Sequence, residues 1–98
     1  MIVIAGKIKA KVHDWDEAQR QIDAIVAAVE AEPGCHAYRI YVDPADRNTF
    51  FLFEEWESAD ALASHRTQPH MTPFRAFLKS VGATSDLNRY EIASMGKL

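Results

Sequence analysis

HAYRIYVDPADRNTFFLFEEW, residues 36–56, predicts a β-hairpin, and the topology of the rest of the chain follows from it. Tyr38, Ile40 and Val42 alternate with more polar residues and therefore share one face of an extended strand. The DPAD sequence at residues 43–46 is typical of a turn, and residues 49–56 form a second β-prone run. The two runs predict neighbouring antiparallel strands.

A strand and a helix are expected before this hairpin. Residues 2–12 alternate between apolar and polar side chains, which indicates a half-buried strand. Residues 14–32 carry apolar side chains at three- and four-residue spacing, which predicts an amphipathic helix. Asp14 has the side chain of an N-cap, and Pro33-Gly34 ends the helix.

Two helices and a last strand are expected after the hairpin. They are a short helix over residues 59–66, a second one begun by Pro69 and closed by Gly82, and a strand over residues 86–95. The order is therefore β-α-β-β-α(α)-β. This order predicts an α+β fold, the ferredoxin-like split βαβ plait, with a four-stranded antiparallel sheet and helices on one face.

The composition narrows the class of protein. A chain of 98 residues predicts one domain over residues 1–98, and 48% apolar with 26% charged residues is typical of a soluble globular protein. The net charge is −3 and no basic stripe is present, so we expect no nucleic-acid partner. No apolar run approaches the roughly 18 residues of a membrane span. Cys35 is the one cysteine and cannot form an intrachain disulfide, which favours the cytoplasm.

Both faces of the predicted third strand are apolar. Phe50 and Leu52 lie on one face, and Phe51 and Phe53 on the other. Helices cover only one face of such a sheet, so Phe51, Phe53 and Tyr41 would form an exposed apolar patch, which usually marks a partner surface. The simplest expectation is a homodimer in which the two sheets pack together.

Three segments resemble the antibiotic biosynthesis monooxygenase family. They are EPGCHAYRIYVDP (residues 32–44), FFLFEEWESADALASH (residues 50–65) and PHMTPF (residues 69–74), in matching order and spacing. The resemblance implies a dimeric α/β barrel with a pocket between sheet and helices in each subunit. The family's activities include cofactor-free oxygenation of polycyclic phenols, oxidation of quinols by O₂, haem degradation and isomerisation of a small phosphorylated signal. The chain is most similar to the small quinol monooxygenase type.

Two departures argue against particular reactions of the family. Members that oxidise polyketides have an asparagine four residues before the tryptophan, where this chain has Leu52. Members that degrade haem have an asparagine on the first strand, and this strand has none. Three possibilities remain: the quinol type, the isomerase branch, and a protein without catalysis. The segment SHRTQPH (residues 64–70) resembles the histidine segment of the isomerase branch.

The resemblance places Trp56 and Glu54 on the pocket side of the sheet. A carboxylate between sheet and helices must be paired or have a raised pKa. Glu54 therefore either forms a buried ion pair or a hydrogen bond to a helix end, or it is a catalytic group, acting as a general base or orienting a histidine. Trp56 is either a core aromatic or a platform on which a planar substrate stacks.

His65 is the candidate base for this chemistry. Cofactor-free oxygenation begins with deprotonation of a phenol or hydroquinone, and imidazole has the pKa suited to that step. His70 lies at a helix start, where the helix dipole disfavours protonation, so a neutral His70 would donate a hydrogen bond to a substrate oxygen. Either histidine could instead be a capping or packing residue. They do not share one helix face as in the H-E-x-x-H motif, so we expect no metal.

We therefore expect a cofactor-free monooxygenase that oxidises a small quinol or phenol with O₂. Glu54 would orient the base, and the substrate ring would lie against apolar side chains that could equally belong to the core: Trp56, Tyr38, Phe74 and Met71. One alternative is an isomerase or degrading enzyme for a small polar signal metabolite. The other is a dimeric ligand-binding protein without catalysis.

Overall fold

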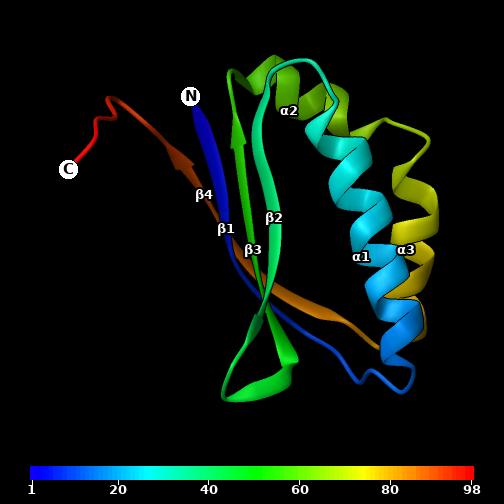
Figure 1. Cartoon of the computed structure of the whole chain (residues 1–98). Helices are drawn as coiled ribbons and strands as arrows, with labels where there is room; N and C mark the ends of the chain where they lie inside the picture. Colours follow the sequence, from blue (N-terminus) through cyan, green and yellow to red (C-terminus); the bar gives the residue numbers. More distant parts are fainter.

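Four strands form one antiparallel sheet in the computed structural model, which describes residues 1–98. The strands are β1 (Ile2–Lys9), β2 (Cys35–Asp43), β3 (Asp46–Trp56) and β4 (Thr84–Glu91), in the spatial order β2-β3-β1-β4. The helices are α1 (Trp15–Glu30), α2 (Ala59–Arg66) and α3 (Met71–Ser80), and all three lie on one side of the sheet (Figure 1). The predicted ferredoxin-like α+β plait is confirmed. None of the helices has the length and apolar character needed to cross a membrane.

The connection from the first strand to the first helix is held by hydrogen bonds to near and distant residues. Asp14 caps α1, because its Oδ1 accepts a hydrogen bond from the Glu17 backbone N–H at 3.1 Å. Residues 10–12 were expected to continue β1, but they leave the sheet. The Ala10 and Lys11 backbone N–H groups donate to the carbonyls of Asn48 and Val81, outside the strand ladder. This short segment therefore ties β1 to the start of β3 and to the end of α3.

Two later boundaries also differ from the sequence expectation. The third helix begins at Met71 instead of Pro69, because Gln68 and Pro69 form a turn whose carbonyls accept from the backbone N–H groups of Met71 and Thr72. The last strand covers residues 84–91 instead of 86–95, because its only partner is the eight-residue β1. The length of β1 therefore sets the length of β4.

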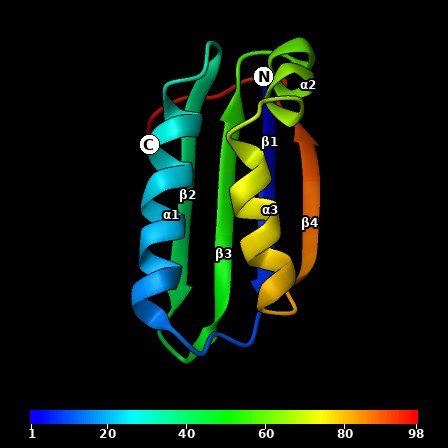
Figure 2. The ribbon, with the colours of Figure 1, turned by 90° about the vertical axis from the view of Figure 1, so that its right-hand side faces the viewer.

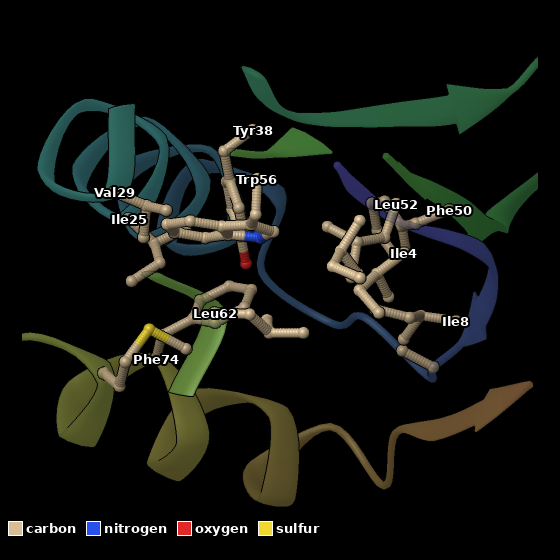
Figure 3. Packing of buried hydrophobic residues seen from close by; sticks show 13 residues of the cluster. Ile4, Ile8, Ile25, Val29, Tyr38, Phe50, Leu52, Trp56, Leu62 and Phe74 are labelled. Atoms are coloured by element: carbon tan, nitrogen blue, oxygen red, sulfur yellow. The ribbon is translucent and has the colours of Figure 1, made fainter. Parts of the chain in front are cut away.

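The core lies between the sheet and the helices. Trp56 and Val29 are 0% exposed, and Tyr38 and Leu62 are each 2% exposed, at the end of the sheet where β3 leads into α2 (Figure 3). Burying one large apolar side chain contributes roughly 1.5–3 kcal/mol. Tight packing at this end restricts the movement of the neighbouring polar side chains.

Two surfaces of the sheet remain without a helix. All eight residues of β4 are exposed, and Figure 2 shows no helix in front of this strand. On the opposite face of the sheet, Tyr41 is 54% and Phe51 42% exposed, and the two are direct cross-strand neighbours. Phe53 lies on the same face and is half-buried. The apolar patch expected from the alternation of β3 is therefore present in this chain.

Candidate active site

A buried polar cluster joins the end of α1, the end of α2 and the start of α3. The Glu32 Oε2 atom lies 2.9 Å from Nδ1 of His65 and 2.9 Å from Nε2 of His70. The side chains of Glu32 and His65 are only 7% and 4% exposed, whereas that of His70 is 31% exposed. One carboxylate oxygen thus bridges two imidazoles from two different helical segments.

Helix geometry brings His65 to this position. Ser58 caps α2 by accepting a hydrogen bond from the Ala61 backbone N–H at 3.1 Å. Leu62 and His65 are three residues apart on α2, so they share the face that is buried against the sheet. Glu32 is held by the turn after α1, where its backbone N–H donates to Val29 and its carbonyl accepts from Cys35.

The hydrogen bond to Glu32 defines what each nitrogen of His65 can do. An ionised carboxylate only accepts hydrogen bonds, so Nδ1 of His65 donates its proton to Glu32. In the neutral ring, Nε2 then carries the lone pair. This nitrogen lies 3.8 Å from Oε1 of Glu54, which is too far for a hydrogen bond. Nε2 is therefore the basic atom of the ring and lies on the side of Glu54.

Glu54 is the second buried carboxyl group of the site. Its Oε1 accepts a hydrogen bond from the Trp56 indole N–H at 3.0 Å, and the residue is 6% exposed. Burial raises the pKa of Glu54, while the Trp56 hydrogen bond and the nearby His65 act in the opposite direction. The carboxyl group of Glu54 thus keeps its proton to higher pH than an exposed glutamate would.

Two aromatic rings support His65 from the core. The Trp56 ring centroid lies 4.7 Å from that of His65 with a 31° tilt, and Tyr38 lies 5.9 Å away. Trp56 has no exposed surface, so its ring stacks on the imidazole and presents no face to a ligand. Burial raises the pKa of Tyr38, so its phenol remains protonated at neutral pH.

A pocket of about 200 Å³ opens beside Glu54 and His65. It is lined by Ile4, Glu54, Leu62, His65, Arg66, Met71, Arg75 and Leu87. Of the residues expected at the site, Glu54, His65 and Met71 line this pocket. Phe74 and His70 instead line a separate groove of about 170 Å³ between α1 and α3. Tyr38 and Trp56 line neither space and belong to the core.

Comparison of the chain with known proteins shows the family to which it belongs. The family model described as antibiotic biosynthesis monooxygenase matches residues 1–76. The chain belongs to the antibiotic biosynthesis monooxygenase family. The resemblance seen in the sequence is thereby confirmed.

Relatives of this family member carry both unassigned and enzymatic names. The chain is 34% identical over 73 residues to the uncharacterized protein sll1783 of Synechocystis, a match that covers 74% of the chain and 50% of the relative. The chain thus spans about half the length of that relative. It is 29% identical over 89 residues to the "Probable quinol monooxygenase YgiN" of Escherichia coli, covering 81% of the chain and 86% of the relative.

Solved structures share the fold of this family member. PA3566 from Pseudomonas aeruginosa has a TM-score of 0.76 and 26% identity, with 94% of each chain covered. SnoaB, a cofactor-independent oxygenase from Streptomyces nogalater, in its N63A mutant form has a TM-score of 0.78 and 16% identity, covering 96% of this chain and 95% of that one. At this identity SnoaB shows a common fold only.

Three residues of this candidate site were missed in the sequence: Glu32, Arg66 and Arg75. Glu32 opens the EPGC motif, but nothing local indicates that its side chain reaches histidines 33 and 38 residues further along. Arg75 could have been found, because it lies four residues after Met71 and shares its helix face. No group of three or more His, Cys, Asp or Glu side chains is arranged to hold a metal ion.

Proposed function

We propose that this protein is a cofactor-free monooxygenase that oxidises a small quinol or phenol with O₂. The observation that carries this proposal is the buried hydrogen bond between Glu32 and Nδ1 of His65. It leaves Nε2 as the basic atom beside Glu54, and both residues line one pocket. An oriented base next to a small cavity is what deprotonation of a phenolic hydroxyl requires from a protein.

The reaction starts with transfer of the hydroxyl proton to Nε2 of His65. The resulting anion is electron-rich and passes one electron to O₂, and the two radicals combine by forming a bond between a ring carbon and oxygen. The proton held on Nε2 passes to the outer peroxide oxygen. Loss of the proton from the same ring carbon then breaks the O–O bond: one oxygen stays on the ring as a carbonyl, and the other leaves as hydroxide and takes up that proton to become water. A phenol and one O₂ thus give a quinone and one water.

The proposed roles refine those expected from the sequence. Glu32 is the group that orients His65, because it makes the hydrogen bond that Glu54 does not make. His70 holds Glu32 from its other side, so its Nε2 is engaged with the protein and not with substrate. Glu54, with its raised pKa, is suited to exchange a proton with Nε2 during this transfer.

The comparisons support this reaction class. YgiN carries a quinol monooxygenase name, and its match extends over 81% of this chain. SnoaB, described as a cofactor-independent oxygenase, shares the fold.

The expected cytoplasmic location is also part of this proposal. It is supported by Cys35, which is unpaired. Burial raises the pKa of Cys35 to about 11, which leaves the thiol unreactive.

Oxygen uptake with menadiol tests this function. Wild-type protein should consume O₂ above the rate of menadiol autoxidation. His65→Gln should lower kcat/KM by about 10²–10⁴-fold, the usual contribution of a general base. Glu32→Gln should lower it less, because the amide oxygen can still accept from Nδ1. His13→Gln, which changes an exposed histidine, is the control and should have no effect. Uptake no faster than autoxidation across a panel of quinols would refute the proposal.

An isomerase acting on a small polar metabolite is the second candidate. The observation in its favour is that Arg66 and Arg75 line the pocket, since an anionic metabolite needs a cationic site. The two functions differ in one measurable respect. The isomerase converts its substrate at the same rate with and without O₂, whereas the monooxygenase stops when O₂ is removed.

A further inference from the structure

Two arginines at the pocket have no acidic partner. Neither Arg66, in the last turn of α2, nor Arg75, on α3, takes part in any of the ion pairs of the structure. Arg75 donates one hydrogen bond, from Nη2 to the Arg66 carbonyl oxygen at 2.8 Å. That contact anchors the Arg75 side chain against the end of α2. Most of the guanidinium donors of both residues remain available to a ligand.

Helix periodicity directs both arginines to the same cavity as the proposed base. Leu62 and Arg66 are four residues apart on α2, and Met71 and Arg75 are four residues apart on α3. All four side chains line the pocket of about 200 Å³, together with Glu54 and His65. The two arginines and the proposed base therefore line one and the same pocket.

The charge of this space is positive. Arg66 and Arg75 are always protonated, and the carboxyl group that shares the pocket, Glu54, is the one whose pKa is raised by burial. Arg66 partly counteracts that rise, so its charge acts within the site. The rest of the lining is apolar, from Ile4, Leu62, Met71 and Leu87. Such a pocket is complementary to a molecule with an apolar body and one anionic group.

We propose that the ligand of this pocket is a single-ring hydroxylated aromatic acid, whose carboxylate is bound by Arg66 and Arg75. The planar guanidinium matches a carboxylate in a bidentate geometry. A pocket of about 200 Å³ is below the roughly 300–1,000 Å³ of most drug-sized ligand sites, which favours one ring over a polycyclic system. The inference rests on the proposed function for the fate of the hydroxyl group, but binding of the acid does not depend on any reaction.

Calorimetry with the full chain tests the binding. 3-Hydroxybenzoate and its neutral amide, 3-hydroxybenzamide, differ in charge and hardly in shape, and neither is a hydroquinone that oxidises readily. Wild-type protein should bind the acid at least about tenfold more tightly than the amide, as expected for a charge-assisted contact. Arg66→Gln and Arg75→Gln should each weaken binding of the acid by about tenfold and leave the amide unaffected.

Arg20→Gln is the matched control for these variants. It removes the same charge from the surface of α1, where Arg20 is paired with Glu17, and should bind the acid like wild type. The inference is overturned if wild type binds acid and amide equally, or if both pocket variants bind the acid normally while their circular dichroism shows them folded. Tighter binding of phenyl phosphate than of 3-hydroxybenzoate would also overturn it, because the site would then be one for phosphate.

A kinetic measurement separates this inference from the proposed reaction. With 2,5-dihydroxybenzoate as substrate, Arg75→Gln should raise KM by about tenfold and leave kcat nearly unchanged, whereas His65→Gln should lower kcat. Tight, arginine-dependent binding of the acid without oxygen uptake would support the binding site and refute the monooxygenase. Oxygen uptake that is equally fast with a quinol lacking the carboxylate would support the monooxygenase and refute the binding site for the acid.

Discussion

Two buried carboxyl groups lie within one site, and their neighbours give them different properties. Glu32 accepts hydrogen bonds from two imidazoles. Glu54 accepts one hydrogen bond from the neutral Trp56 indole, and burial raises its pKa. In the mechanism we propose, the residue that orients the base and the residue that exchanges its proton are thus distinguished by their partners.

The raised pKa of Glu54 predicts how stability depends on pH. The folded protein holds the Glu54 proton more tightly than the unfolded chain does, so stability falls as pH rises from the ordinary value near 4.5 up to the folded pKa. The loss is at most about 1.4 kcal/mol per pH unit. Glu54→Gln should lack this loss. Its free energy of unfolding, measured with urea between pH 4 and about pH 8, should therefore increase relative to that of wild type as pH rises. Exposed Glu57→Gln should follow the wild-type curve. Parallel curves for Glu54→Gln and wild type would contradict the prediction.

At the scale of elements, the pocket depends on how closely β4 approaches β1. Gly6 lies in the middle of β1 opposite Leu87, a pocket residue, and has φ of +156°. A Cβ atom at Gly6 would lie 2.1 Å from the Asp86 carbonyl oxygen, in the neighbouring strand. The glycine therefore allows a close approach that no other residue permits.

Gly6→Ala should therefore destabilise the fold. The new methyl group must push β4 away, and the backbone conformation is itself strained for an L-residue, so we expect a loss of roughly 1–3 kcal/mol. Urea unfolding measures this loss. Gly96→Ala, where a Cβ meets nothing within 4 Å, is the control and should change stability little. A Gly6→Ala variant as stable as wild type would show that β4 is not held against β1 in the way described.

At the scale of the whole molecule, the sheet has one covered and one open face. Figure 1 shows α1 and α3 on the covered side and no element on the other. Tyr41 and Phe51 are paired across β2 and β3 on the open face, with Phe53 two residues along β3. Exposed aromatic side chains in adjoining positions favour association, and we propose that a second copy of the chain packs here.

A charge on this face should separate the proposed dimer. Wild-type protein should sediment as a dimer at micromolar concentration, and Phe51→Lys as a monomer, because each dimer would bury two unpaired ammonium groups near its two-fold axis. Ala63→Lys, on the exposed side of α2, adds the same charge away from the sheet and should remain dimeric. A monomeric wild type would refute the dimer, and a dimeric Phe51→Lys would move the interface elsewhere.

Periodicity and turn chemistry were enough to predict the elements and their order. The alternation of residues 36–56, the amphipathic spacing after Asp14 and the breaks at Pro33-Gly34 and Gly82 all arise from interactions between near neighbours. The end of β1 differed from the expectation because residues 10–12 bond to the distant residues Asn48 and Val81, whereas the start of α3 differed because Gln68 and Pro69 form a local turn. His65, Glu54 and Met71, which lie on strongly patterned elements, line one cavity, and their roles there stay a prediction.

The composition of the site depended on contacts across the fold. Glu32 reaches His65 over 33 residues and His70 over 38, and a sequence pattern says which face a side chain occupies but not what lies opposite. The same applies to Trp56, which has the type and strand position expected of a substrate platform but is covered completely by its neighbours. The elements thus follow from local backbone preferences. The partners of the two carboxylates, and the meeting of Arg66 and Arg75 at one pocket, follow only from the way sheet and helices pack.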